Sequence, residues 1–390
     1  MSRILKHKKW VDMIFICGIL LMLYALLLLP EVSVSAARDG IELCLNVIIP
    51  SLFPFFVLST LAVDMGMISA LGKLTEKIMR PLFRVNGSCA GAFLLGILGG
   101  YPVGARTAIS LYESGSCTKT EAERLLSFCN NSGPAFILGV VGAGIFSSSK
   151  AGIWLYLAHV TASVVVGILF RSYGGKEESR QITHIMSTEY RPFSQAFPDA
   201  VKNAFSGTGN ICAFVIFFTV VIRLLFQTGI LPFISSVFTR FGLDVSVVES
   251  LVTGLIEMTS GVWSLRDMAG DMGDKLSMAA FILGWAGLSV HCQVLSFIGT
   301  SGLSTRTYFF GKLSHGILSG ILVWLLSSLM NWDTPVSAHL AQEVSTIANL
   351  SFPQTIMVSL TTVLGIFAIL CIISVYIYRK ECGKTEHNHV

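Results

Sequence analysis

The sequence predicts an all-α polytopic membrane protein, with about eight transmembrane helices and about two re-entrant hairpins in two inverted repeats. Three observations support this fold class. The 390 residues are 53% apolar and 13% charged, a composition typical of membrane proteins. Long apolar stretches recur along the chain. Several are interrupted by glycine, proline and polar residues, and the interruptions follow the same order in both halves.

The composition also excludes several classes of protein. The net charge of +4 is small, and the basic residues lie in short loops, where they set membrane orientation. There is no basic patch for nucleic acid. The nine cysteines include no CxxC pair, so neither a metal site nor a cofactor is expected. Gly96–Arg106 lacks the Gly-Lys-Ser/Thr of a phosphate-binding loop. We therefore predict a protein that is not an enzyme, whose partners are a small molecule and the lipid bilayer.

The apolar pattern divides the chain into five segments. These are an N-terminal transmembrane helix and loop (1–39), a first repeat (40–171), a cytoplasmic linker (172–202), a second repeat (203–331), and a C-terminal transmembrane helix with a cytoplasmic tail (332–390). The basic residues at both ends place the N- and C-termini in the cytoplasm. The first helix is expected to remain uncleaved, because its apolar run is longer than a typical signal core and many more spans follow. A cleaved signal peptide is the alternative, since Val34-Ser35-Ala36 resembles a cleavage site.

Eight full spans are expected. They are Met13–Leu29, Ile41–Val63 with interruptions at Pro50 and Pro54, a broken helix that ends at Phe146, Ile153–Phe170, Asn203–Phe226, Met278–Ile298, Lys312–Leu329 and Thr355–Tyr378. Ser88–Tyr112 and Val247–Leu265 are short and broken, so each is predicted to be a re-entrant hairpin. Breaks of this kind occur at membrane depth only where they are buried in protein or line a cavity.

The order of elements repeats. Asn46–Leu61 aligns with Asn210–Leu225, and Gly96–Gly100 aligns with Gly254–Met258. The five residues Ala135–Gly139 recur identically as 280–284. The basic loops direct the two aligned spans oppositely across the membrane. The repeats are therefore predicted to be inverted, an architecture typical of secondary transporters.

The candidate substrate-binding residues lie at four breaks. They are Gly99, Gly100, Tyr101, Pro102, Gly104 and Arg106 in the first hairpin, Asn130, Asn131, Ser132 and Gly133 in the first broken helix, Glu257, Thr259 and Ser260 in the second hairpin, and His291 and Gln293 in the second broken helix, expected at 289–293. Exposed helix amides at such breaks favour anions.

Two of these residues carry charge. Arg106 is expected to face an anionic substrate, and Glu257 to act as a coupling or hydrogen-bonding group. A structural salt bridge between them is the alternative, because buried membrane charges usually face a cavity or a partner. His291 is a packed hydrogen-bonding group or a proton relay. Tyr101 has a ring that could stack on an aromatic ligand.

Four sequence strings carry a family resemblance. They are PSLFPFF at 50–56, GGYPVGAR at 99–106, EAERLLSFCNNSGPAF at 121–136 and EMTSG at 257–261. Over roughly residues 40–330, the chain resembles the YlbJ family of sporulation integral membrane proteins, within the nucleoside-recognition, or Gate, domain group. The family is distantly similar to concentrative nucleoside transporters, in which two re-entrant hairpins and two unwound helices surround the substrate.

The resemblance implies a mother-cell protein that moves dipicolinic acid, a small planar aromatic dianion, across the outer forespore membrane. Two alternatives stay open. One is a structural or assembly protein needed for the spore cortex or envelope, and the other is a nucleoside transporter, which would not need Arg106. The sequence leaves open the coupling ion, the direction of transport and the oligomeric state, and a homo-oligomer is compatible with the resemblance.

Overall fold

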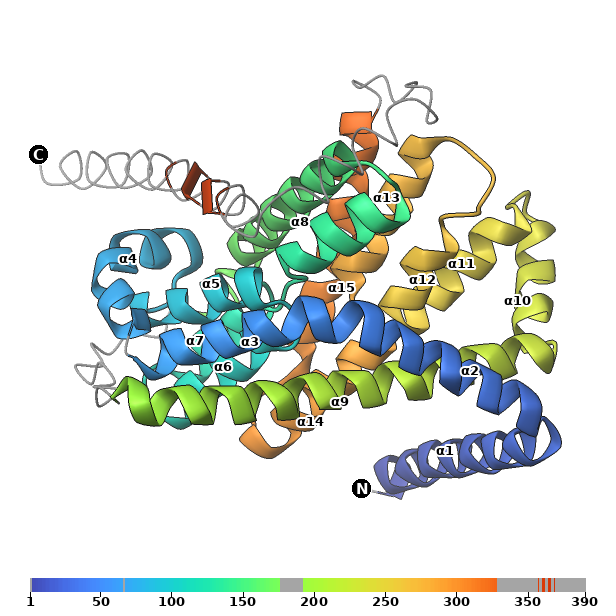
Figure 1. The fold of residues 1–390 in the computed structure, drawn as a ribbon. Coiled ribbons are helices and arrows are strands. Elements are labelled where there is room, and N and C mark those ends of the chain that lie inside the picture. Colours follow the sequence, from blue (N-terminus) through green and yellow to red (C-terminus); the bar gives the residue numbers. More distant parts are fainter. Residues whose placement is uncertain are drawn as a thin grey trace, which may run out of the picture.

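The computed structural model describes residues 2–65, 67–175, 192–327 and a few isolated positions between 357 and 368, and these form a bundle of helices (Figure 1). Among the described residues, four helices are long and apolar enough to cross a membrane, or up to six if each of two bent helix pairs is one span. This is fewer than the predicted eight. The expected span ending at Phe146 consists of two short helices, and most of Thr355–Tyr378 lies outside the described residues.

Each half has a long helix, a connecting helix, a hairpin, a broken helix and a closing span. The first half contains α1 (Ser2–Leu28), α2 (Pro30–Leu43), the π-helical turn η1 (Cys44–Ile48), α3 (Ile49–Asp64), α4 (Met67–Phe83), η2 (Gly87–Cys89), α5 (Ala90–Gly99), α6 (Val103–Glu113), α7 (Lys119–Leu126), η3 (Ala135–Ile145) and α8 (Ser149–Phe170). The second contains α9 (Phe193–Gln227), α10 (Ile230–Thr239), α11 (Val245–Ile256), α12 (Met258–Ser264), α13 (Met272–Trp285), α14 (Gly287–Ser301) and α15 (Thr305–Ser327).

The prolines of the second predicted span do not interrupt it. The backbone is helical from Pro30 to Asp64 through Pro50 and Pro54. In a regular α-helix the ring of Pro50 would clash with the carbonyl four residues earlier. The wider turn η1 lies immediately before Pro50, and there the Ile49 amide bonds to the Cys44 carbonyl five residues back. A local π-helical turn therefore accommodates the proline without ending the helix.

Helices α2 and α3 pack against α9, and the two chain segments run in opposite directions (Figure 1). Buried alanines of α9, Ala200 and Ala204, contact the apolar face of α2–η1–α3, and small residues allow such close helix packing. The opposite directions are those expected of an inverted repeat. Helix α9 begins ten residues before the predicted second repeat, so the predicted boundary at 202 lies inside it, and the one at 39 lies inside α2.

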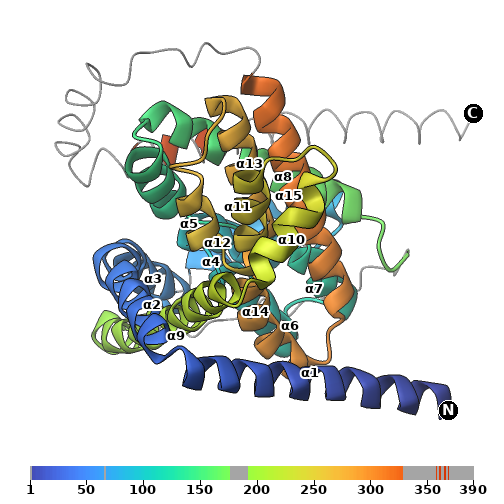
Figure 2. The same ribbon diagram turned by 90° about the vertical axis from the view of Figure 1, so that its right-hand side faces the viewer.

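Helices α4–α8 and α11–α15 form the main core, which lies beside α2, α3 and α9 (Figure 2). Within this core Phe83 stacks on Phe128, with ring centroids 4.6 Å apart, and Phe93 packs against Phe128 at a tilt, with centroids 5.2 Å apart. Helices α13 and α15 cross closely at two glycines. A Cβ added to Gly284 would lie only 2.7 Å from the Gly316 Cα. This packing holds the two broken helices in fixed places beside the hairpins.

The identical sequences at 135–139 and 280–284 are not structurally equivalent. Ala135–Gly139 lies in η3, after the first helix break, whereas 280–284 lies in α13, before the second. The second helix break was predicted at 289–293, and this prediction is wrong. The break falls at Ala286 and Gly287, both with positive φ, and 289–293 is regular helix within α14. A positive φ is unfavourable for a residue that has a Cβ, whereas glycine adopts it readily. Gly287 is therefore the residue that marks the second helix break in the sequence.

Candidate functional site

The first hairpin turns at Gly100 and meets the first broken helix there. Helix α5 ends at Gly99, and Gly100 has φ +79°, which glycine adopts readily. A Cβ at Gly100 would lie 3.0 Å from the Gly133 nitrogen. Behind the turn, a Cβ at Gly96 or Gly104 would lie 1.7 or 2.0 Å from the Cys129 carbonyl oxygen. These glycines allow the backbone of the broken helix to lie directly on the hairpin.

The second hairpin repeats this arrangement. Helix α11 gives way to α12 at Glu257, whose backbone is extended. The Glu257 carboxylate accepts hydrogen bonds from the amides of Thr259 and Ser260, at 2.9 and 2.7 Å. Those two amides are therefore occupied and do not form the anion site that the sequence suggested. Gly287, at the second helix break, approaches the hairpin so closely that a Cβ would lie 2.8 Å from the Met258 nitrogen.

Three of the four breaks, together with the first two turns of α14 directly after the fourth break, border one inner cavity of about 50 Å³. Its lining residues are Ile48, Leu52, Gly100, Tyr101, Ser132, Gly133, Phe136, Ile211, Val215, Glu257, Met258, Thr259, Ser289, Val290 and Gln293. The lining combines apolar and aromatic side chains with a few polar groups, as small-molecule sites do. Sites for drug-sized ligands are roughly 300–1,000 Å³. The cavity in this conformation is therefore smaller than a site for a drug-sized ligand.

The predicted site residues fall into three places. Gly100, Tyr101, Ser132, Gly133, Glu257, Thr259 and Gln293 line the inner cavity. Gly99, Pro102, Gly104, Asn130, Asn131 and His291 are buried around it without lining it. Ser260 lines a separate outer pocket, and Arg106 is exposed.

Arg106 does not take the expected role in this conformation. It lies on the exposed side of α6 and does not line the cavity. Glu257 is only 1% exposed and caps α12, and the ion pairs found in the described part of the chain do not join it to Arg106. The side chain of Arg106 is one helical turn beyond the hairpin tip, where helix periodicity directs it away from the packed face.

Several buried polar groups near the cavity lack a hydrogen-bond partner among the described residues. They include Oε1 of Gln293, Nδ2 of Asn130, Oδ1 of Asn131 and Nε2 of His291. Unpartnered buried polar groups are rare and costly, and they occur where a ligand or water binds. Only Gln293 lines the cavity itself. His291 instead bonds Tyr308 through Nδ1, at 3.0 Å, so its packed role is the one seen here.

One buried cation, Lys312, contacts the cavity-lining residue Tyr101, and it is not among the site residues predicted from the sequence. Lys312 is 1% exposed, and its ammonium nitrogen lies 2.7 Å from the Tyr101 hydroxyl and 3.0 Å from the Asn130 carbonyl oxygen. Because the predicted span begins at Lys312, the sequence places this side chain at the membrane interface. Helix α15 begins at Thr305, so Lys312 lies two turns inside. A lysine within an apolar span was the available signal, because buried membrane charges mark functional sites.

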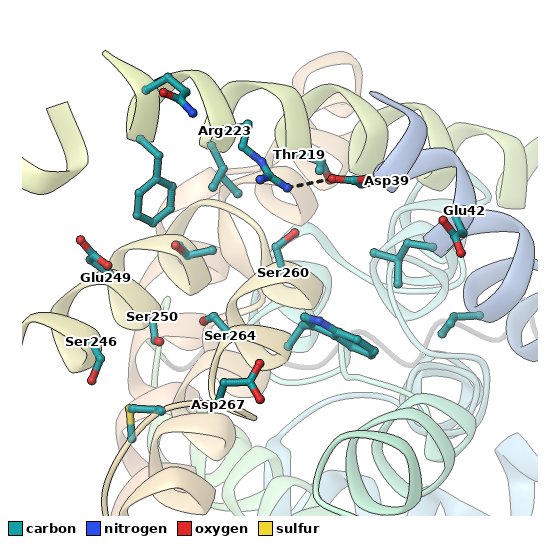
Figure 3. A pocket seen from close by; sticks show the side chains of 18 of the residues that line it. Asp39, Glu42, Thr219, Arg223, Ser246, Glu249, Ser250, Ser260, Ser264 and Asp267 are labelled. Carbon is teal, nitrogen blue, oxygen red and sulfur yellow. Dashed lines mark hydrogen bonds and ion pairs between the residues drawn. The ribbon is translucent and has the colours of Figure 1, made fainter. Parts of the chain in front are cut away.

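An open outer pocket of about 890 Å³ lies next to the cavity (Figure 3). Neighbouring residues border the two spaces: Val47 and Ser260 line the outer pocket, while Ile48 and Thr259 line the cavity. The outer lining carries the carboxylates Asp39, Glu42, Glu249 and Asp267 and the guanidinium of Arg223, which bonds Asp39 at 2.8 Å. Within the described residues, no group of His, Cys, Asp and Glu side chains has the geometry of a metal site.

Comparison with known proteins gives three similarities. Two solved structures each match 80% of this chain and 86% of their own chain at 11% identity: a doubly substituted CNTnw in an outward-facing state, with a TM-score of 0.44, and CNTnw in an inward-facing substrate-bound state, with 0.43. Residues 45–188 match the family described as Gate: Nucleoside recognition. The sporulation integral membrane protein YlbJ of Bacillus subtilis (strain 168) is 32% identical over 319 residues, which cover 76% of this chain and 78% of that protein.

Proposed function

The chain belongs to the YlbJ family of sporulation integral membrane proteins, and from this premise we propose that it is a secondary transporter or facilitator of a small anionic aromatic solute. The proposed substrate is dipicolinic acid, and the proposed location is the outer forespore membrane, with both termini in the cytoplasm. One observation carries the proposal. Both hairpin turns, the first helix break and the first two turns of α14, directly after the second break, border a single cavity.

This arrangement suits alternating access. Broken helices that meet between two repeats form the substrate sites of secondary transporters, and movement of one part against the other opens the site to either side. The cavity is too small for an aromatic acid, while an open pocket of about 890 Å³ adjoins it. We propose that the outer pocket is a vestibule and that movement at the α12 end of the wall admits the substrate.

The charges nearest the cavity bear on the kind of substrate. The Lys312 ammonium lies directly behind Tyr101, and in a low-dielectric interior it attracts an anion over several ångströms. Tyr101 and Phe136 line the cavity and offer aromatic faces to a planar ring. These features favour a small aromatic acid. In this proposal Lys312 has the role of counter-charge to the substrate that the sequence suggested for Arg106.

A neutral nucleoside is the second candidate, because the cavity also contains hydrogen-bond acceptors. The Glu257 carboxylate and the unpartnered Oε1 of Gln293 would accept hydrogen bonds from hydroxyl or amino groups. The match of residues 45–188 to a nucleoside-recognition family supports the same class. A role in assembly of the spore envelope remains the alternative if no solute is moved.

Uptake into proteoliposomes containing the purified full-length protein tests the proposal. Labelled dipicolinate and a labelled nucleoside would be compared for wild type and for Gln293→Ala. The matched control is Arg106→Ala, since that side chain is exposed and outside the cavity. We expect saturable dipicolinate uptake that Gln293→Ala reduces by roughly tenfold or more and Arg106→Ala leaves intact. Uptake of the nucleoside alone would favour the second candidate, and uptake of neither would favour the assembly role.

A further inference from the structure

A cluster of three titratable side chains lies behind the cavity and has no part in lining it. Lys312 and His315 are one turn apart on α15, and His159 lies on α8. All three are 1% exposed. The Lys312 ammonium nitrogen is 3.1 Å from Nδ1 of His315, and the two imidazole ring centroids are 4.3 Å apart. The cluster therefore joins the closing spans of the two halves.

The hydrogen bonds define the neutral tautomer of each ring. Nε2 of His315 lies 2.8 Å from the His159 carbonyl oxygen and can only donate to it. The neutral His315 then carries no proton on Nδ1, which accepts from Lys312. Nε2 of His159 accepts from the Ser132 amide at 3.0 Å, so the proton of neutral His159 is on Nδ1. That Nδ1 has no partner among the described residues. His159 is thus buried with its N–H donor lacking an acceptor.

The cluster holds its charge without a carboxylate partner. The three hydrogen bonds of Lys312 go to the Tyr101 hydroxyl, the Asn130 carbonyl and His315. The other titratable groups that act on the cluster are the Cys129 thiol from the first broken helix, His291 from α14 and Tyr308 from α15 itself. Tyr156 of α8 is also buried, with an unpartnered hydroxyl.

The acidic side chains of the helices that pack on α15 lie away from the cluster. Asp274 lies in the first turn of α13, and Glu123 of α7 binds the Ser304 amide, at the beginning of α15. A buried ammonium without an acidic neighbour is costly. The ammonium is in direct hydrogen-bond contact with a base, because His315 offers it an unprotonated nitrogen.

The cluster reaches the cavity at two points. The Tyr101 hydroxyl, which accepts from Lys312, belongs to a residue of the cavity wall, and it donates to the Leu283 carbonyl at 2.7 Å. At the other end, His159 accepts from the amide of Ser132, which also lines the cavity. Both contacts are at chain breaks, so opening of the cavity must alter the hydrogen bonds of the cluster.

We propose that Lys312, His315 and His159 form a proton-binding site that couples substrate movement to movement of a proton, an inference that rests on the transport function proposed above. The Nζ–H bond of Lys312 breaks as a new N–H bond forms on Nδ1 of His315, which leaves a neutral amine and an imidazolium. No electron is transferred. The reverse step returns the proton from Nδ1 of His315 to Nζ of Lys312, and the cluster gains or loses this proton by exchange with a hydronium ion in the water that enters when the cavity opens. The Tyr101 hydroxyl keeps its own proton on the Leu283 carbonyl. Proton relays of this kind within membranes use buried ionisable side chains.

The test separates coupling from transport itself. His315→Gln keeps a hydrogen-bonding side chain but cannot take up a proton. Proteoliposomes would be assayed for dipicolinate accumulation driven by a pH gradient and for exchange of labelled against unlabelled dipicolinate at equal pH. We expect His315→Gln to exchange at the wild-type rate and to lose gradient-driven accumulation by about tenfold, within the usual range of coupling between sites. Ser319→Ala is the matched control, because Ser319 is a buried polar residue one turn beyond His315 on α15 and its hydroxyl has no hydrogen-bond partner among the described residues, so this variant should keep both activities.

A second measurement does not depend on uptake. Nitrogen-15 NMR of histidine-labelled protein in lipid nanodiscs would follow His159 and His315 as pH is varied, with His315→Gln and Lys312→Met for assignment. We expect the His315 signal to change protonation and Lys312→Met to alter that change. Histidines that keep one protonation state throughout would overturn the proposal, as would equal loss of exchange and accumulation in a folded His315→Gln protein. Absence of any uptake by the wild type, with the NMR change present, would instead count against the transport function.

Discussion

Gly100 and Gly287 make the same kind of close backbone contact in the two halves. Each has a left-handed backbone, with φ of +79° and +76°, and each lies where a hairpin meets a broken helix. A Cβ at Gly100 would be 3.0 Å from the Gly133 nitrogen, and one at Gly287 would be 2.8 Å from the Met258 nitrogen. In the first half the glycine belongs to the hairpin, and in the second it belongs to the broken helix. The same close contact is thus made from opposite sides.

Alanine at Gly287 is expected to destabilise the protein substantially. The left-handed conformation costs a β-carbon residue roughly 1–2 kcal/mol, and the Cβ would also clash with the backbone of Met258. Overpacking of this kind adds about 1–3 kcal/mol. A lower midpoint of thermal unfolding in detergent, together with lost uptake, is the expected result.

Gly229→Ala separates the two causes. Gly229 has φ +77° but nothing within 4 Å of the position of a Cβ. This variant should show the cost of the conformation alone, and its unfolding midpoint should fall less than that of Gly287→Ala. Equal losses in the two variants would mean that the contact between Gly287 and the hairpin adds nothing to stability.

Glu257 is expected to contribute both to the stability of the protein and to substrate binding. Glu257→Ala removes the cap of α12, a change that costs about 0.5–2 kcal/mol, and removes a carboxylate from the cavity wall. Asp244→Ala is the matched control, because Asp244 caps α11 in the same way but is exposed and outside the cavity. We expect similar losses of stability and a loss of uptake only for Glu257→Ala. Intact uptake in the Glu257 variant would remove this carboxylate from the binding site.

The hydroxyl of Tyr101 is expected to contribute to stability. Tyr101→Phe leaves the Leu283 carbonyl and one ammonium proton of Lys312 without a partner, and a buried polar group left unsatisfied costs roughly 1–3 kcal/mol. Tyr112→Phe is the control, since the Tyr112 hydroxyl on the same hairpin makes no hydrogen bond within the described residues. Thermal unfolding of both variants measures the difference, and equal midpoints would contradict the hydrogen-bond network.

The convergence of the breaks could be predicted from the sequence because glycine and proline within apolar stretches have few structural uses. Gly99–Gly100 and Glu257 do mark the hairpin turns, and both hairpins do border the cavity. The position of the second helix break was harder to predict from the sequence. Polar residues suggested 289–293, yet the backbone turns at Ala286 and Gly287, and a single glycine before a helical stretch is a weak signal.

The charged residues could not be placed in the same way. Helix periodicity gives the relative directions of side chains but not which face meets the other half of the protein. Arg106 therefore appeared central although it is exposed, and Lys312 appeared interfacial although it is buried. The hydrogen bonds of Lys312 join residues up to 211 positions apart, and such a contact has no local sequence pattern.

Charge in the outer pocket should affect the rate of uptake if the substrate is an anion. Glu249→Gln removes one carboxylate from the lining and Arg223→Gln removes the guanidinium (Figure 3). We expect the first to raise and the second to lower the initial rate of dipicolinate uptake by roughly two- to tenfold at low salt, through steering of the approaching anion. High salt should suppress both effects. A neutral nucleoside measured in the same vesicles should show neither effect, so unchanged dipicolinate rates at low salt would contradict entry of an anion through this pocket.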